Sequence, residues 1–398
     1  MEGPARKIAR KETPALPKNN DASQSCENTL DSNTYLTYDI LRIIFQYLNA
    51  RDLTNAAMVC RSWLEAANNE KSTRGPCCFI QTSIAHKSQL LDLNFIRDMR
   101  VKPSAGFFFL SRDTPCNIKD LLQPCLPKHC EVIMLFTTGI IMDNREIEQE
   151  TFYNMVCAFL PQIPNVRIQT FKVAKYSLTL IRQISEELIR TFTDFQTSMS
   201  CHETSTCFML LCNYKGYTAA KFLASSLATD LKTREGIGKV SVWGGIVDDI
   251  YAQRISANSY VRSQCLHEKG YSRCVAVLIT GAIQMWSMIL EKEYNTKEQV
   301  EEKLKKFKDQ VKLKKHSVGF MFACRARGKD MYNESNVEST IFKRLFPKVP
   351  LVGCFGYGEF GKNTVDEEKS HKEERKRTKN FDVWFNEFST VFLIITYG

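Results

Sequence analysis

The chain has 398 residues, 43% of them hydrophobic, and carries 54 Lys and Arg against 44 Asp and Glu. That length and apolar content suit a folded globular protein of two or three domains and exclude disorder throughout. The longest apolar stretches, such as Cys274–Ile283, fall short of the roughly 20 residues that a membrane helix needs, so we expect no membrane partner.

The first 33 residues are polar, lack apolar periodicity and contain three prolines, Pro4, Pro14 and Pro17. Such a segment cannot bury enough apolar surface to offset the entropy of ordering, so residues 1–33 are predicted to be a disordered tail. It also lacks the apolar core of a secretory signal, which predicts a protein that stays inside the cell. In that reducing compartment the 15 cysteines are expected to be thiols, not a disulfide framework.

Residues 34–72 carry apolar side chains mostly three and four positions apart, which is typical of amphipathic helices. The pattern is interrupted at Asn49–Asp52, where Asp52 could cap the following helix. We therefore expect two or three short helices. A unit of this size buries little surface alone, so a partner that covers its apolar stripe is a physical expectation.

From residue 75 onward, short apolar runs alternate with helical patterns, which predicts an α/β body, with α+β as the alternative. We divide this body into two parts, residues 75–270 and 271–398. The predicted strands are Cys77–Thr82, Gly106–Leu110, Glu131–Phe136, Val166–Val173, Cys207–Cys212, Val240–Trp243, Cys274–Thr280, Val318–Phe322, Pro350–Phe355 and Val391–Tyr397. The clearest predicted helices are Glu148–Phe159, Leu178–Phe195, Thr218–Ala228, Lys297–Leu313 and Val337–Phe346. No repeat of about 20 to 50 residues is evident.

The helix predicted from Lys297 is the best defined, because Thr296 and Gln299 can form a capping box before one apolar stripe. Residues 362–380 alternate in charge with almost no apolar side chains and are predicted to be a surface loop. Within it, Glu374–Lys379 is typical of a nuclear-import signal, so we expect a cytoplasmic protein that can also enter the nucleus.

The excess positive charge sits in three separate segments, Met1–Lys18, Lys297–Lys315 and Lys362–Lys379. A nucleic-acid-binding protein needs such charge on one face, with aromatic side chains or a reading helix between the cations. Because here the charge lies on a tail, a helix and a loop, we expect a solvated surface and no nucleic-acid partner.

The helical segment contains a Leu…Tyr-Leu…Asp-Leu…Val-Cys-Arg-x-Trp sequence, from Tyr35-Leu36 through Tyr47-Leu48 and Asp52-Leu53 to Val59-Cys60-Arg61-Ser62-Trp63. This pattern closely resembles an F-box. Thr37 departs from it, because many F-boxes have proline after the leading leucine. The resemblance implies docking to a Skp-type adaptor, and through it to the cullin and RING subunits of an SCF ubiquitin ligase.

The F-box resemblance also implies which side chains contact the adaptor, with an aromatic anchor among aliphatic residues. They are Leu36, Ile40, Leu41, Ile44, Leu48, Leu53, Val59, Cys60 and Trp63. The alternative is that this stripe only packs against the following domain. A unit of this size favours a separate cover.

The body carries a second resemblance, in Val318–Gly328, Glu338, Phe346–Gly353 and Gly356–Gly361, with weaker signals at Thr138–Ile140 and Gly244–Asp248. These stretches look like a FIST domain, a module regarded as a sensor of small intracellular ligands. Ala326 and the charged loop after Gly361 depart from the family pattern. The resemblance implies that the body recognises a protein substrate, or a small ligand, through one site.

That implied site lies where two predicted strands end, a place where ligand sites gather in α/β sheets. Its residues are Cys324, Arg327, Gly328, Gly356, Gly358 and Glu359. The structural alternative is that the glycines satisfy tight turns while Arg327 and Glu359 form an ion pair.

The sequence does not favour three further types of site, because each lacks an element that it requires. Gly356–Gly361 spells G-x-G-x-x-G, yet residues 362–380 cannot supply the helix that a dinucleotide site needs. Cys324 could be an activated thiol if Arg325 and Arg327 lowered its pKa, but no histidine can be assigned as its base. Cys125–Cys130 and Cys201–Cys212 lack paired metal-binding knuckles, so neither metal nor cofactor is expected.

The sequence therefore predicts a non-catalytic substrate receptor of a ubiquitin ligase, in which a small helical F-box precedes a larger FIST-like body. The protein to be ubiquitinated, and then degraded by the proteasome, would bind the body. The alternative is a small-ligand sensor whose ligand controls the choice of partner.

Overall fold

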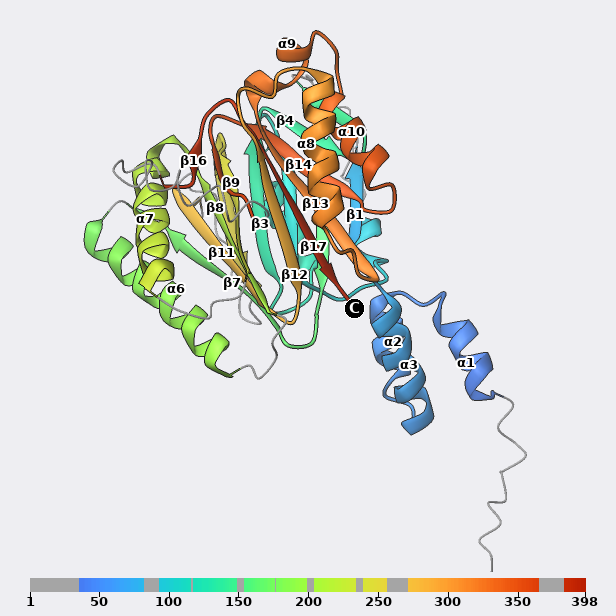
Figure 1. Ribbon diagram of the computed structural model, residues 1–398. Coiled ribbons are helices and arrows are strands. Elements are labelled where there is room, and N and C mark those ends of the chain that lie inside the picture. Colours follow the sequence, from blue (N-terminus) through green and yellow to red (C-terminus); the bar gives the residue numbers. More distant parts are fainter. Residues whose placement is uncertain are drawn as a thin grey trace, which may run out of the picture.

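The computed structural model describes residues 36–81, 93–115, 117–148, 154–175, 177–198, 204–233, 239–255, 271–364 and 383–398. The predicted tail, most of the predicted charged loop and the basic stretch Glu374–Lys379 lie outside these residues. Figure 1 shows a helical unit that projects from one end of a larger body of sheets and helices. The described chain contains no helix long and apolar enough to cross a membrane.

Three short helices form the N-terminal unit, α1 (Tyr38–Phe45), α2 (Ala50–Ala56) and α3 (Arg61–Thr73). The prediction of two or three helices is confirmed, but the predicted cap is wrong. Asn49, not Asp52, is the N-cap of α2, since the Asn49 side chain accepts a hydrogen bond from the Asp52 N–H at 2.8 Å. Asp52 lies inside the helix, in its first turn, where a negative charge favours the helix dipole.

The body contains three mixed sheets. The first, in the order β1-β6-β2-β3-β10, comprises β1 (Cys77–Gln81), β2 (Pro103–Ser111), β3 (Glu131–Thr137), β6 (Met155–Pro161) and β10 (Asp249–Arg254). The second, in the order β16-β15-β9-β8-β11-β7, comprises β7 (Val166–Val173), β8 (Ser205–Cys212), β9 (Lys239–Ile246), β11 (Cys274–Gly281), β15 (Glu359–Lys362) and β16 (Phe385–Asn386). The third, in the order β12-β17-β13-β14-β4-β5, comprises β4 (Gly139–Met142), β5 (Arg145–Glu148), β12 (Gln284–Leu290), β13 (His316–Cys324), β14 (Leu351–Gly356) and β17 (Thr390–Tyr397).

The three sheets follow one plan. Each contains one parallel pair, β2 with β3, β8 with β9, or β13 with β14. After the second strand of each pair the chain crosses into a neighbouring sheet, so that β4 pairs with β14, β10 with β3 and β15 with β9. Each of the three sheets thus receives one strand from the segment that follows the parallel pair of a neighbouring sheet. This arrangement recurs at intervals far longer than about 20 to 50 residues. Strands from both predicted parts share the second and third sheets.

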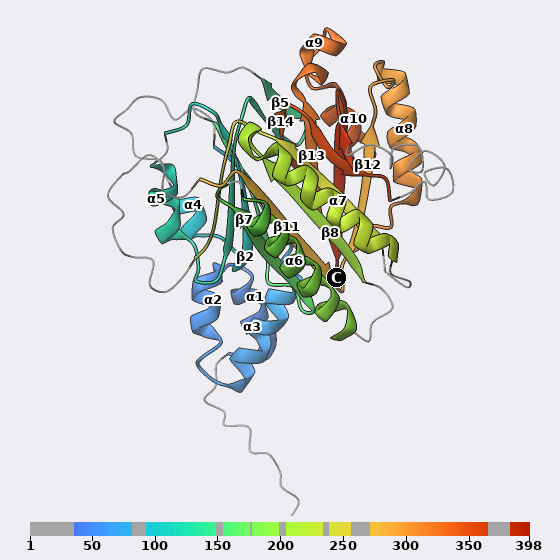
Figure 2. The ribbon, with the colours of Figure 1, turned by 90° about the vertical axis from the view of Figure 1, so that its left-hand side faces the viewer.

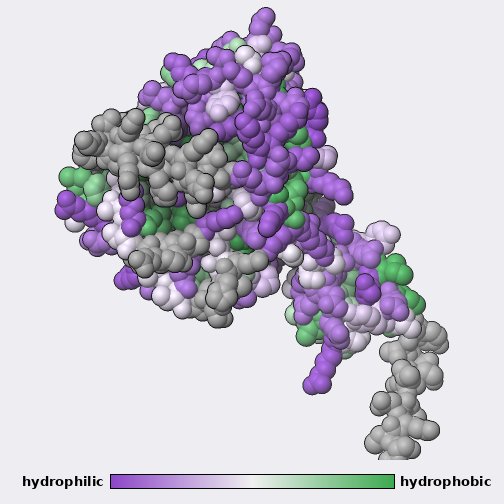
Figure 3. All heavy atoms as spheres, in the orientation of Figure 1, coloured by the Kyte–Doolittle hydropathy of each residue, from purple (hydrophilic) through white to green (hydrophobic). Residues whose placement is uncertain are grey.

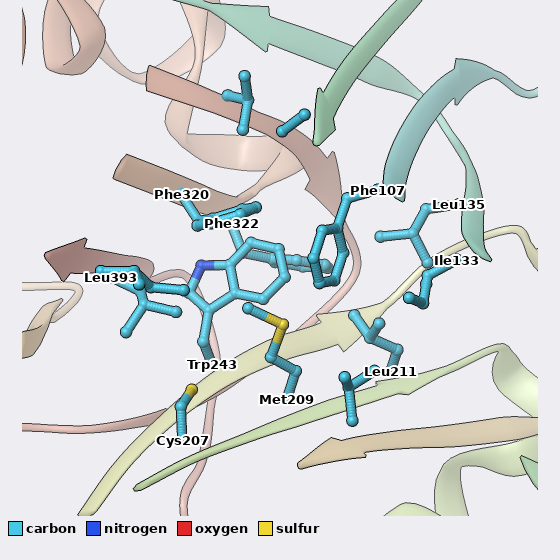
Figure 4. Packing of buried hydrophobic residues seen from close by; sticks show 14 of the residues in the cluster. Phe107, Ile133, Leu135, Cys207, Met209, Leu211, Trp243, Phe320, Phe322 and Leu393 are labelled. Atoms are coloured by element: carbon cyan, nitrogen blue, oxygen red, sulfur yellow. The ribbon is translucent and has the colours of Figure 1, made fainter. Parts of the chain in front are cut away.

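The inner faces of all three sheets meet in one core (Figure 4). At its centre Phe107, Trp243 and Phe320 are fully buried, with ring centroids 5.3 Å apart for Phe107–Phe320 and 5.6 Å apart for Trp243–Phe320. Such edge-to-face contacts between large rings supply much of the apolar burial of a core. The strands are apolar on both faces because helices cover the outer side of each sheet.

The covering helices are distributed over the three sheets. The first sheet packs against α4 (Asn94–Arg97), α5 (Ile118–Leu122) and the 3-10 turn η1 (Gln123–Cys125), and the second against α6 (Leu178–Ser198) and α7 (Tyr217–Thr233). The third packs against α8 (Lys297–Gln310) and α10 (Val337–Leu345), while α9 (Lys329–Tyr332), η2 (Tyr214–Gly216) and η3 (Arg325–Arg327) are short connections. This mixed architecture confirms the predicted α/β class.

One predicted helix is wrong. Residues Glu148–Phe159 contain the end of β5 and most of β6 instead of a helix. The apolar run from Met155 to Leu160 is fully buried, as a strand covered on both faces requires, and periodicity alone cannot distinguish such a run from a buried helix. The helix predicted from Lys297 is confirmed, including its capping box, although it ends at Gln310.

Candidate functional site

The first helix, α1, has one buried and one exposed apolar face. Leu41 and Phe45, four residues apart, pack into the small core of the unit, where Leu41 is only 1% exposed. Other apolar side chains on and beside the same helix remain in contact with solvent, and Ile43 and Tyr47 are the most exposed at 59% and 82%. Figure 3 shows hydrophobic residues gathered on the outer side of this unit.

A second group of exposed apolar side chains follows from the link between α2 and α3. Met58 and Val59 lie in that link, and Leu64 lies in the first turns of α3. Together with those of α1 they form a set that we call the apolar set. Its members are Leu36, Ile40, Ile43, Ile44, Tyr47, Met58, Val59 and Leu64.

Exposed large hydrophobic side chains are concentrated in the helical unit. Of the twelve large hydrophobic side chains that are exposed in the described chain, eight belong to it, although the unit supplies only residues 36–73. Scattered single apolar residues on a surface are ordinary, whereas a concentration of this kind marks an interaction site.

The structure divides the residues predicted for adaptor contact by their burial. Leu36, Ile40, Ile44, Val59 and Cys60 are exposed, while Leu48 and Trp63 are partly buried. Leu41 and Leu53 are fully buried in the core of the unit, so they support the surface and are not part of it. Trp63 packs edge-on against Phe45, with ring centroids 5.4 Å apart.

Four members of the apolar set were not among the predicted contacts. They are Ile43, Tyr47, Met58 and Leu64. Their apolar character was visible in the sequence, but the three-residue and four-residue spacing admits more than one apolar stripe on so short a helix. Only the packing of α1 on α3 shows which stripe faces inward.

The helical unit is joined to the body by a network of hydrogen bonds and ion pairs in which Glu70 and Arg74 are buried and Arg100 is exposed. Arg74, which follows α3, donates to the Glu70 carboxylate at 2.8 Å, to the Phe45 carbonyl at 2.8 Å and to the Arg100 carbonyl. Arg100 in turn donates to the carbonyl of Gln46 at 2.6 Å. These bonds satisfy carbonyls at the end of α1 and tie the unit to the segment before β2.

The site predicted in the body is built differently from the prediction. Arg327 is 1% exposed and pairs with Glu338 at 2.7 Å, not with Glu359 as the structural alternative had it. Its other donors reach the carbonyls of Glu291, Phe388 and Tyr294 and the hydroxyl of Tyr332. A guanidinium with all its donors engaged holds loops together and has none left for a ligand.

The remaining predicted residues of the body lie around this buried cluster. Glu359 accepts hydrogen bonds from the backbone N–H of Ser389 at 3.0 Å and from its hydroxyl at 2.7 Å, and burial raises the pKa of Glu359 to about 8. Gly328 lies against the Glu148 carboxylate, and Gly356 and Gly358 lie against aromatic rings. Gly358 has φ of 149°, a backbone conformation that favours glycine.

Cys324 does not have the properties of an activated thiol. Burial and the neighbouring Glu359 carboxylate raise its pKa to about 11, the opposite of the shift that a nucleophile needs. The stretch Gly356–Gly361 spans the end of β14, a turn at Tyr357 and Gly358, and the start of β15, so a strand lies where a dinucleotide site needs a helix. Among the described residues no group of three or more His, Cys, Asp or Glu side chains could hold a metal ion.

The three short helices carry the apolar set and are attached to a mixed α/β body. This arrangement is typical of a docking module joined to a larger domain. Residues 38–78 match the F-box-like family model, which confirms the expected F-box at this position. The FIST resemblance of the body remains a prediction.

Known proteins resemble the chain over different lengths. F-box only protein 22 of Homo sapiens and that of Pongo abelii are each 23% identical over 395 residues, covering 90% of this chain and 93% of theirs. An F-box/LRR-repeat protein of Arabidopsis thaliana is 32% identical over 79 residues, 20% of this chain and 14% of that protein. Among solved structures, a cyanuric acid hydrolase from A. caulinodans shares 8% identity with a TM-score of 0.35, covering 81% of this chain and 99% of that one.

Proposed function

We propose that the protein is the substrate-recognition subunit of an SCF-type ubiquitin ligase, with its F-box docked on a Skp-type adaptor. The observation that carries the proposal is the apolar set, eight exposed large side chains in a unit that matches the F-box-like model. The similarity to F-box only protein 22 over nearly the whole chain supports it. Cullin and RING subunits would join through the adaptor, and the chain itself would perform no chemistry.

Burial of the apolar set is physically sufficient to hold a partner. Covering one large aliphatic side chain is worth about 1.5–3 kcal/mol when it passes from full exposure to full burial. The members of the set are between 40% and 82% exposed, so each offers a substantial part of that gain. An adaptor with a complementary apolar groove would therefore bind without the ionic contacts that salt screens.

The body would then present the substrate to the ligase, in the cytoplasm and in the nucleus. The ionic network of Glu70, Arg74 and Arg100 supports this arrangement, because it holds the F-box and the body in one orientation. The alternative role of small-ligand sensor gains no support from the predicted site, where Arg327 is fully engaged by protein groups.

The proposal is tested by purifying tagged full-length protein from cells and detecting the adaptor, cullin and RING subunits. Ile43→Asp places a charge in the apolar set, where an interface would bury it unpaired, so all three subunits should be lost together. Leu313→Asp changes an exposed leucine outside the set and should retain them. Retention of the cullin by the Ile43→Asp variant would refute the proposal.

A further inference from the structure

Helices α6 and α7 lie side by side over the outer face of the second sheet (Figure 2), and a groove of about 860 Å³ runs between them. A groove of that volume lies within the range of about 300–1,000 Å³ typical of binding sites. Its apolar walls include Leu178 and Ile189 on α6 and Tyr217 and Phe222 on α7. Neither predicted functional site contributes to it.

Beyond Tyr217 and Phe222, the α7 side of the groove carries small side chains. Ala219, Leu223 and Ala224 of α7 are buried against the sheet, while Ser225, Ser226 and Thr229 face the groove. Ser225 and Thr229 are four residues apart and therefore lie on one face of the helix. Small residues at this spacing allow the backbone of another helix to approach closely.

The opposite wall also offers a polar group to an occupant. Ser185 of α6 lines the groove, and the residue is 4% exposed. A polar side chain of a bound helix that reached the Ser185 hydroxyl would gain a hydrogen bond.

Charges of both signs line the groove in a definite order. β7 and β8 are each antiparallel to β11, so they run in the same direction, and α6 and α7 start at the same edge of the sheet. Arg182 and Lys221 therefore lie near the start of the groove, and Glu186 and Asp230 lie farther along it. An anionic membrane or a phosphorylated ligand would meet carboxylates here, whereas a peptide with charges of both signs matches this order.

We infer that this groove binds an amphipathic helix of a partner protein, with the apolar face of that helix between α6 and α7. The lining residues of α7 run from Tyr217 to Thr233, about 24 Å of helix, and those of α6 from Leu178 to Ile189, about 17 Å, so both walls together contact about three turns of a bound helix. The bound helix would carry an acidic side chain toward Arg182 and a basic one toward Glu186. The inference does not depend on adaptor docking, because the groove and the F-box share no residues.

The test is selection from a displayed library of helical peptides about 18 residues long, patterned with one apolar face and random polar positions, against full-length protein. Enriched peptides should carry the predicted order of charges. They should bind Thr229→Arg about tenfold or more weakly, because an arginine from this exposed position would fill the groove. Glu187→Arg alters an exposed neighbour of Glu186 that does not line the groove, and should leave binding unchanged.

Several outcomes would overturn the inference. They are the absence of any enriched peptide, equal binding of enriched peptides to the Thr229→Arg variant, and binding of phosphatidylserine vesicles that Arg182→Glu abolishes. A dimer of the free protein that Thr229→Arg dissociates would assign the groove to a second copy. Displacement of the peptides by a synthetic 365–382 segment, which has only two apolar residues, Val365 and Phe381, would assign it to the chain itself.

Discussion

Residues of the F-box either pack in its core or lie on its surface. Their burial distinguishes these two roles, whereas the sequence motif does not. Leu41 and Ile43 are two residues apart, yet one is 1% and the other 59% exposed. Replacing a core leucine by alanine costs about 2–5 kcal/mol, while an exposed position is usually neutral within about 0.5 kcal/mol. Loss of adaptor binding therefore implicates the surface only when the substituted residue is exposed, as Ile43 is and Leu41 is not.

Cys60 offers a chemical probe of the proposed surface. It is exposed at the start of α3, and the backbone N–H of Trp63 lowers the pKa of its thiol. Cys207, Cys274 and Cys354 are buried, and burial raises the pKa of each. Because the thiolate is the reactive form, brief iodoacetamide treatment should modify Cys60 well before these three.

Adding a purified Skp-type adaptor should slow the modification of Cys60 at least about tenfold, since the thiol lies beside Val59 of the apolar set. Peptide mapping by mass spectrometry measures both rates. The buried cysteines, which react slowly with iodoacetamide, serve as internal controls. Equal labelling of Cys60 with and without bound adaptor would place it outside the interface.

Two buried carboxyl groups predict how stability depends on pH. Burial raises the pKa of Glu146 to about 7 and that of Glu359 to about 8, both above the ordinary value of 4.5. The folded protein therefore binds these protons more tightly than the unfolded chain. Their contribution to stability is fully present below the unfolded pKa and is lost as the pH rises through the folded values.

Glu359→Gln should weaken this pH dependence. Between about pH 5 and about pH 8, the free energy of unfolding of the parent protein should fall by more than that of the variant. The difference between the two decreases should be on the order of a few kcal/mol. Urea unfolding at the two pH values measures the difference. An identical loss of stability in both proteins would show that Glu359 is ionised in the folded state.

At the scale of elements, the body and the F-box meet through the ends of α1 and α3 and the start of α2. The Ala50 N–H donates to the Met99 carbonyl at 2.8 Å, and Arg100 donates to Gln46 and Glu70. These contacts are few, so their removal should loosen the orientation of the F-box without unfolding either part.

Arg100→Ala removes a side chain that is 57% exposed and bridges the two parts. We expect faster amide exchange around Ala50 and Met99, with adaptor affinity unchanged and with less ubiquitin transferred to substrates. Arg97→Ala provides a matched change of an arginine on α4, whose side chain makes no ion pair or hydrogen bond to the helical unit among the described residues. Unaltered exchange in the Arg100→Ala variant would show that other contacts orient the F-box.

Elements could be predicted from the sequence where the local signal was strong. The capping box of Thr296 and Gln299 and the stripe of Val300, Leu304 and Phe307 define α8 without tertiary information. The run from Met155 to Leu160 resembles a helical pattern in the sequence, because burial on both faces removes the alternation that marks a strand. The capping role fell to Asn49 instead of Asp52 because both residue types can accept the same bond.

At the scale of the molecule, the α/β class could be predicted but not the exchange of strands among three sheets. β4 pairs with β14 and β10 with β3, and such partners more than 100 residues apart leave no trace in local spacing. The same limit applies to the cluster around Arg327. Its partner Glu338 lies in the first turn of α10, and its carbonyl acceptors lie in the connection between β12 and α8 and in the segment before β17, which only the fold brings together.

At the scale of the whole molecule, we propose that the apolar set binds an adaptor while the body remains free to bind a substrate. The most direct measurement is the dissociation constant of the full-length protein for a purified Skp-type adaptor, by calorimetry. We predict micromolar or tighter binding, weakened about tenfold or more by Tyr47→Ala, with the melting temperature unchanged because Tyr47 is 82% exposed. Absence of binding by the parent protein, or unchanged affinity in both Tyr47→Ala and Ile43→Asp, would contradict the account.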